Sequence, residues 1–150
     1  MKLTGSHELD APRDEVWEAL LDPEVIAATL PGCDGLEEVG ENEYVAPIRV
    51  GVGPVEGKFE GRFTLSEIQP PESYHLDIKG KGPTGFMQGA ADIRLEASGA
   101  STILHYEVNA NIGGRVASVG QRLIESTGKL VARQGLKRLE KKMKERREDG

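Results

Sequence analysis

The chain has 150 residues, of which 37% are hydrophobic and 29% are charged, a balance typical of one folded domain and unlike that of a disordered chain. Its net charge of -6 argues against a nucleic-acid partner, because such partners select basic surfaces. No apolar run approaches the roughly 20 residues that a membrane-spanning helix needs, and residues 1–7 contain no apolar signal-peptide core. We therefore expect a cytoplasmic protein.

The first thirty residues predict a strand and two short helices. Residues 1–9 alternate in side-chain character, which is typical of a strand. Pro12 suits the first turn of a helix, and Asp22 is a suitable N-cap for a second helix. Pro31 and Gly32 end this helical stretch.

Residues 44–112 alternate with a period of two, which predicts a series of strands. Short turns rich in glycine and proline or in small polar residues separate the strands, at 51–54, 69–72, 83–85 and 98–101. Each strand has one apolar and one polar face, so the sheet is antiparallel and covered on one side only. Because the turns are short, successive strands are neighbours in a meander.

The cover of the sheet is expected from the last third of the chain. After Gly113 and Gly114 the apolar residues follow a helical stripe, which predicts a helix from about residue 115 onward. We assign residues 1–136 to a single domain and residues 137–150 to a charged helix end that frays. This end holds seven Lys/Arg and four Asp/Glu, so an acidic partner or an anionic membrane surface is a possible contact.

The fold class is therefore α+β. A curved antiparallel sheet of about six or seven strands surrounds a long C-terminal helix, and two short helices follow the first strand.

Glycine and alanine occupy many inward positions of the strands, where they alternate with aromatic and aliphatic residues. Glycine weakens a strand and marks a bend or a close approach. The terminal helix also carries Gly120, Gly128 and Gly135. Two interpretations remain open: close packing of the helix on the sheet, or an apolar cavity of ligand size. The predicted lining of such a cavity is Val55, Gly57, Phe59, Gly61, Phe63, Tyr74, Leu76, Ile78, Met87, Gly89, Ala91, Leu104, Tyr106, Val108, Gly120, Leu123 and Ile124.

The sequence offers little support for catalysis or for a metal site. His75 and His105 fall on outward faces, whereas His7 falls inward, so three or four ligands do not converge. No inward strand position carries a carboxylate, and an inward acid or lysine near His7 would instead favour an enzyme. The polar groups expected to face the cavity are His7, Tyr44, Tyr74, Thr102 and Tyr106. An apolar pocket with a few hydroxyls suits a lipid-like molecule or a quinone headgroup.

Two turns carry a family resemblance. The first is Pro31-Gly32-Cys33, and the second, Gly51-Val52-Gly53-Pro54, leads directly into the strand that begins at Val55. With this spacing, the chain resembles the carbon monoxide dehydrogenase G-subunit family of the START-like, or Bet v 1-like, superfamily. The resemblance implies a helix-grip fold. It also implies a non-catalytic accessory protein without a cofactor of its own.

The resemblance further implies the partners. They are a hydrophobic small molecule, lipid or quinone-like, and the subunits of a molybdenum-containing CO dehydrogenase-type hydroxylase, which the protein would help to couple to the membrane or to a quinone. A transient contact with the inner membrane face is left open. The alternative is an assembly or recruitment protein with a filled core and no ligand. Cys33 is the only cysteine and is expected to be a small, partly buried thiol in its turn.

Overall fold

The computed structural model describes residues 1–149. The chain begins with strand β1 (Lys2–Leu9) and helices α1 (Arg13–Leu21) and α2 (Pro23–Thr29). Six strands follow: β2 (Glu37–Gly40), β3 (Glu43–Val52), β4 (Val55–Gln69), β5 (Ser73–Gly82), β6 (Gly85–Ser98) and β7 (Ser101–Gly113). A short 3-10 helix, η1 (Arg115–Val119), leads into the long helix α3 (Gln121–Asp149).

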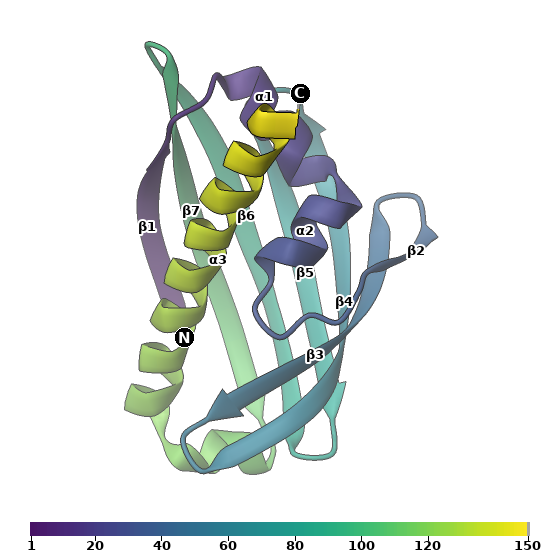
Figure 1. The fold of residues 1–150 in the computed structure, drawn as a ribbon. Coiled ribbons are helices and arrows are strands. Elements are labelled where there is room, and N and C mark those ends of the chain that lie inside the picture. Colours follow the sequence, from purple (N-terminus) through teal and green to yellow (C-terminus); the bar gives the residue numbers. More distant parts are fainter. Residues whose placement is uncertain (150) are drawn as a thin grey trace.

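The strands form one seven-stranded sheet in the order β1-β7-β6-β5-β4-β3-β2. All neighbours pair antiparallel, and β2 to β7 follow one another directly, so the predicted meander is confirmed. Figure 1 shows the sheet curving around α3, with α1 and α2 on the same face. We call this covered face the inner face. The predicted α+β, helix-grip architecture is confirmed.

The short helices begin and end near the predicted residues. The Asp22 carboxylate caps α2, because it accepts a hydrogen bond from the Glu24 backbone N–H at 3.0 Å. Strand β2, in contrast, was not recognised in the sequence. Its residues Glu37–Gly40 include two glutamates and a glycine, which have low strand propensity, and pairing with β3 holds them extended.

The prediction of one continuous helix from residue 115 is wrong at its start. Gly120 has a φ of 98°, a backbone region that glycine adopts far more readily than other residues. It therefore ends η1, and α3 begins anew at Gln121. The chain changes direction at this joint before it crosses the sheet.

The prediction of a frayed end is also wrong for residues 137–149, which continue α3. Leu139 and Met143 are only 2% and 6% exposed, and they belong to the main hydrophobic core. On the surface, Arg146 and Arg147 pair with acidic residues of α1 and of the α2 cap. The apolar stripe continues at helical spacing through the charged segment, and packing holds it in place. Residue 150 lies outside the described residues.

Helix α3 has a strongly basic composition. Residues 121–149 contain ten Lys/Arg and five Asp/Glu, so the helix carries a net +5 in a chain whose total is -6. Among the described residues, no helix combines the length and the apolar character that crossing a bilayer would require.

Candidate functional site

The inner face is packed at both ends of the sheet. At the end where α1 and α2 lie, the upper cluster consists of the buried residues Leu9, Ala11, Val16, Trp17, Ala19, Val25, Leu65, Tyr74, Leu95, Leu104, Leu139 and Met143. At the opposite end, near η1, the lower cluster consists of Val52, Val116 and Ile124. The two clusters share no residue, so the hydrophobic core is interrupted along α3.

Five half-buried apolar side chains of the inner face neither belong to a cluster nor pack against one. This central band consists of Ile48, Phe59, Ile78, Met87 and Val108. Ile48 lies opposite Phe59 in the sheet register, and Ile78 lies opposite Gly89, which is two residues along β6 from Met87. A close-packed interface between helix and sheet would bury such side chains fully. The central band is therefore a part of the inner face that the two clusters leave accessible.

Some of the inward glycines are explained by close packing, and one leaves open space as a cavity would require. A Cβ atom added at Gly80 would meet only the Met87 Cβ, at 3.8 Å, so there is open space at this position. At Gly89 it would lie 2.7 Å from the Asn109 carbonyl oxygen, and at Gly61 it would lie 2.8 Å from the Ile48 Cδ1. Close packing thus explains Gly61 and Gly89, whereas Gly80 leaves room within the central band.

Of the three glycines predicted for the terminal helix, Gly128 permits close approach. A Cβ at Gly128 would meet the Met1 sulfur at 2.9 Å, so this glycine brings α3 against β1. Gly120 is exposed and has nothing within 4 Å of its Cβ position, so its predicted place in the cavity lining is wrong. The neighbouring Ile124 belongs to the lower cluster, and Leu123 packs at its edge.

The other predicted lining residues lie on the inner face of their strands. Half-buried are Val55, Gly57, Phe59, Leu76, Ile78, Met87, Gly89, Tyr106 and Val108, and buried are Gly61, Phe63, Tyr74, Ala91 and Leu104. Tyr74 and Leu104 are part of the upper cluster, so they close the end of the central band rather than line its middle.

The two family turns fasten the helices to the sheet. The Gly32 carbonyl accepts a hydrogen bond from the Arg49 N–H at 2.9 Å, and Cys33 bridges to Ile48, so the first turn joins the end of α2 to β3. Gly53, in the second turn, leaves room for the Leu123 side chain of α3. Burial raises the pKa of the Cys33 thiol, which disfavours the reactive thiolate.

Of the predicted polar groups, Thr102 and Tyr74 serve the upper end of the fold. The Thr102 hydroxyl donates to the Ala11 carbonyl at 2.7 Å and is fully buried. The Tyr74 ring packs edge-on against Trp17, with centroids 5.8 Å apart, and burial holds the Tyr74 pKa well above its usual value. Tyr44 and Tyr106 are half-buried residues packed against the same cluster.

His7 lies next to an acidic residue, Glu140, as the enzyme hypothesis requires, but the two side chains meet at the surface and not inside the fold. Its Nε2 pairs with a Glu140 carboxylate oxygen on α3. Strand β1 forms one edge of the sheet, and the His7 and Glu140 side chains are 28% and 46% exposed. The pair therefore joins α3 to the sheet edge at the surface and does not face the central band.

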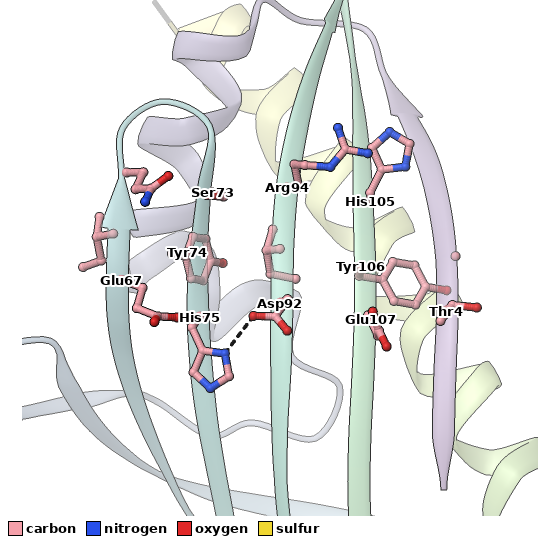
Figure 2. Close-up of a pocket in the computed structure, with 14 residues that line it drawn as sticks. Thr4, Glu67, Ser73, Tyr74, His75, Asp92, Arg94, His105, Tyr106 and Glu107 are labelled. Carbon is pink, nitrogen blue, oxygen red and sulfur yellow. Dashed lines mark hydrogen bonds and ion pairs between the residues drawn. The ribbon is translucent and has the colours of Figure 1, made fainter.

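The outer face of the sheet contains a shallow hollow of about 810 Å³, which the sequence reasoning missed (Figure 2). Its lining includes Thr4, Glu67, Gln69, Ser73, His75, Asp92, Arg94, His105 and Glu107. The His75 Nδ1 lies 2.7 Å from an Asp92 carboxylate oxygen, and this hydrogen bond is the main reason that the pKa of His75 is raised. Among the side chains of residues 1–148, no three His, Cys, Asp or Glu are placed to hold a metal ion.

A curved antiparallel meander that wraps a C-terminal helix, with an apolar inner face, defines a START-like protein of helix-grip fold. A START superfamily protein from Mycobacterium smegmatis shares this fold with a TM-score of 0.74 and 11% identity, over 96% of this chain and 97% of that chain. The Zhui aromatase/cyclase from a Streptomyces species has a TM-score of 0.66 and 16% identity, over 97% of this chain and 94% of that chain. Identities this low show a common fold and nothing finer.

The family is shown by closer matches. A crystal structure of a protein from Geobacillus kaustophilus is 33% identical, with a TM-score of 0.93 over 97% of this chain and 96% of that chain. The family model of the carbon monoxide dehydrogenase G subunit (CoxG) matches residues 5–145, and the chain belongs to that family, as its two turns predicted. A search of curated proteins found no significant match.

Proposed function

We propose that this chain is a non-catalytic accessory protein that binds a hydrophobic small molecule, a lipid or a quinone-like compound, between the sheet and α3. It assists a molybdenum-containing CO dehydrogenase-type hydroxylase in coupling to the membrane or to a quinone. The proposal of a ligand is based on the central band, whose apolar side chains are left half-buried between two packed clusters. The family of the chain supports the partner enzyme.

The chemistry of the central band favours an apolar ligand. Burial of apolar surface contributes about 25 cal/mol per Å², so a molecule that covers these side chains gains affinity without any charged contact. On β1 and on β3 to β7, every inward position is apolar, small, hydroxyl-bearing or histidine. On the edge strand β2, Glu38 lies opposite the inward Tyr44, but it is exposed and outside the central band. A charged ligand would lose its hydration there without a compensating partner.

The same arrangement supports a non-catalytic role. General acid or base catalysis needs an ionisable group within hydrogen-bond reach of the bound molecule. The His7–Glu140 pair lies at the exposed edge of the sheet, and no member of the central band lies opposite an acidic residue in the sheet register. Glu38, opposite the inward Tyr44, is an exposed residue of the edge strand β2. The likeness to an aromatase/cyclase is one of fold alone.

The ligand is tested with a pair of glycine variants from opposite faces of the sheet. Gly80→Leu adds a side chain in the open space of the central band, and Gly51→Leu adds one on the exposed face of β3, where a Cβ meets Glu56 at an ordinary 3.6 Å. Native mass spectrometry of the protein as purified, followed by solvent extraction, identifies any bound lipid or quinone. Titration with menadione, a short quinone, then compares the variants.

We expect Gly80→Leu to lower the affinity for menadione at least about tenfold, which corresponds to roughly 1.4 kcal/mol, while Gly51→Leu binds as the wild type does. Thermal unfolding of both variants shows whether the fold is retained. A protein that carries no ligand when purified and has no affinity for menadione would overturn the proposal. It would favour the alternative, an assembly protein with a filled core, which pull-down of the hydroxylase subunits would then test.

A further inference from the structure

Thr84 lies at the lower end of the inner face, in the tight turn between β5 and β6. Its backbone carbonyl accepts a hydrogen bond from the Val116 N–H at 2.8 Å, which ties the turn to η1. Val116 is part of the lower cluster. The turn is therefore fixed at the boundary between the lower cluster and the central band.

The Thr84 hydroxyl is a buried polar group without a partner. The residue is 6% exposed, and its Oγ1 has no hydrogen-bond partner within the described residues. Buried hydroxyls are normally hydrogen-bonded, because leaving one unpaired is unfavourable. Valine has the same shape and would avoid this loss. A threonine here indicates that the hydroxyl has a partner in the working protein.

The hydroxyl points onto the inner face beside the central band. Its Oγ1 lies 2.5 Å from the position that a Cβ of Gly57 would occupy, so Gly57 leaves room for it. The Phe59 ring, a member of the central band, lies 3.0 Å from the same Cβ position and 3.0 Å from that of Gly82. The hydroxyl and the Phe59 ring thus lie together over Gly57, so the hydroxyl is placed next to an aromatic ring of the proposed ligand site.

We propose that Thr84 is the hydrogen-bond anchor for the oxygen-bearing end of the ligand. The ligand is an apolar molecule that ends in a carbonyl, either of a quinone ring or of an ester, and this carbonyl accepts a hydrogen bond from the Thr84 hydroxyl. The rest of the molecule runs along Phe59 and the central band toward the upper cluster. This inference rests on the proposed function and adds the orientation of the ligand and the chemistry of its polar end.

The test compares two probes that differ only in their oxygens. Menadione carries two carbonyls on a methylnaphthalene skeleton, and 2-methylnaphthalene has the same skeleton without them. Methyl palmitate serves as the ester probe and separates a lipid source from a quinone source. Affinities are measured by equilibrium dialysis for the wild type, Thr84→Val and Thr84→Ser.

We expect Thr84→Val to weaken menadione or methyl palmitate binding by about tenfold, the loss of one hydrogen bond, and to leave 2-methylnaphthalene binding unchanged. Thr84→Ser keeps a hydroxyl and should bind both kinds of probe nearly as the wild type does. Equal binding of every probe by the wild type and Thr84→Val would overturn this inference and leave the proposed function standing. Failure of the wild type to bind any probe would overturn both.

The unfolding temperature tests, without any ligand, whether the Thr84 hydroxyl is bonded within the protein. Without a protein partner to lose, Thr84→Val should unfold at the wild-type temperature or above it. Thr102→Val is the matched control, since the Thr102 hydroxyl does donate to the Ala11 carbonyl, at 2.7 Å, and its loss should lower the unfolding temperature. A comparable decrease for Thr84→Val would mean that the hydroxyl is bonded within the protein, which would overturn the inference.

Discussion

Each of the three histidines pairs with a carboxylate that belongs to another element. The pairs are His7 with Glu140, His75 with Asp92, and His105 with Glu96. They join β1 to α3, β5 to β6, and β6 to β7. Exposed ion pairs of this kind each contribute little to stability.

His75 should titrate above the ordinary histidine value of 6.5, because Asp92 and, more weakly, Asp77 stabilise the imidazolium and so raise its pKa. A pKa that is raised in the folded state adds stability that is fully present below the unfolded value and is lost as the pH rises through the folded value. Stability should therefore decrease slightly as the pH rises above 6.5. An NMR titration of the His75 ring measures this pKa directly.

The matched variant for this titration is Asp92→Asn, which removes the negative charge and keeps the side-chain size. Its His75 pKa should move back toward 6.5. Glu96→Gln is the control, because Glu96 pairs with His105 and not with His75. An unchanged His75 titration in Asp92→Asn would contradict the assignment of the shift to this hydrogen bond.

These residue contacts show what the alternation pattern of the sequence cannot predict. The period-two pattern places His75 and Asp92 on the outer face, but it cannot pair them. The two residues are 17 positions apart, and only the β5–β6 register sets them opposite each other. The outer hollow was missed for the same reason, since it needs the relative positions of β4, β5, β6, β7 and β1.

At the scale of elements, the question is whether the end of α3, residues 137–149, packs as part of the hydrophobic core. Leu139→Ala should lower the free energy of unfolding by about 2–5 kcal/mol, because Leu139 is 2% exposed and the change opens a cavity in the upper cluster. Leu130→Ala, in the same helix, should change it by less than about 0.5 kcal/mol, since Leu130 is 48% exposed. Urea unfolding followed by circular dichroism measures both.

The two leucine variants make the same chemical change at different burial, so helix propensity cancels between them. If Leu139→Ala were as mild as Leu130→Ala, residues 137–149 would not pack against the core in solution, and the frayed end expected from the sequence would be the better description.

The elements that the sequence predicted well are those whose pattern is local. The strands follow from their period-two alternation, and α2 follows from Asp22 and its proline. The end of α3 did not follow, although Leu136, Leu139 and Met143 continue the helical spacing. High local charge favoured fraying, and the burial that opposes it comes from α1 and α2, more than 100 residues away. The break at Gly120 had a local signal in the glycine itself, but two further glycines inside α3 do not break the helix.

At the scale of the whole molecule, the inner face has two packed ends of unequal size. The upper cluster contains twelve buried residues and the lower cluster three. The alternation of glycine with aromatic residues indicated an unusual inner face but could not locate the accessible part. That position depends on where α1, α2 and η1 close the two ends, which is set by packing over long distances in the chain.

This inequality predicts how α3 opens. Local opening costs less free energy where fewer apolar contacts are lost. Backbone amides of residues 125–132, near the lower cluster, should therefore exchange hydrogen faster than those of residues 136–143, which lie against the upper cluster. Hydrogen exchange followed by mass spectrometry of peptic fragments separates these two halves of the helix.

A ligand on the central band should reduce this difference. It would contact the first half of α3 and the sheet together, and binding to the folded state stabilises it by about 2.7 kcal/mol at a ligand concentration of 100 times the dissociation constant. Menadione should slow exchange in residues 125–132 of the wild type and should have much less effect in Gly80→Leu. Equal protection of both halves without ligand would contradict the predicted difference in opening. Slowing by menadione confined to residues 136–143 would contradict a site between the two clusters and would place the binding of hydrophobic molecules elsewhere on the protein.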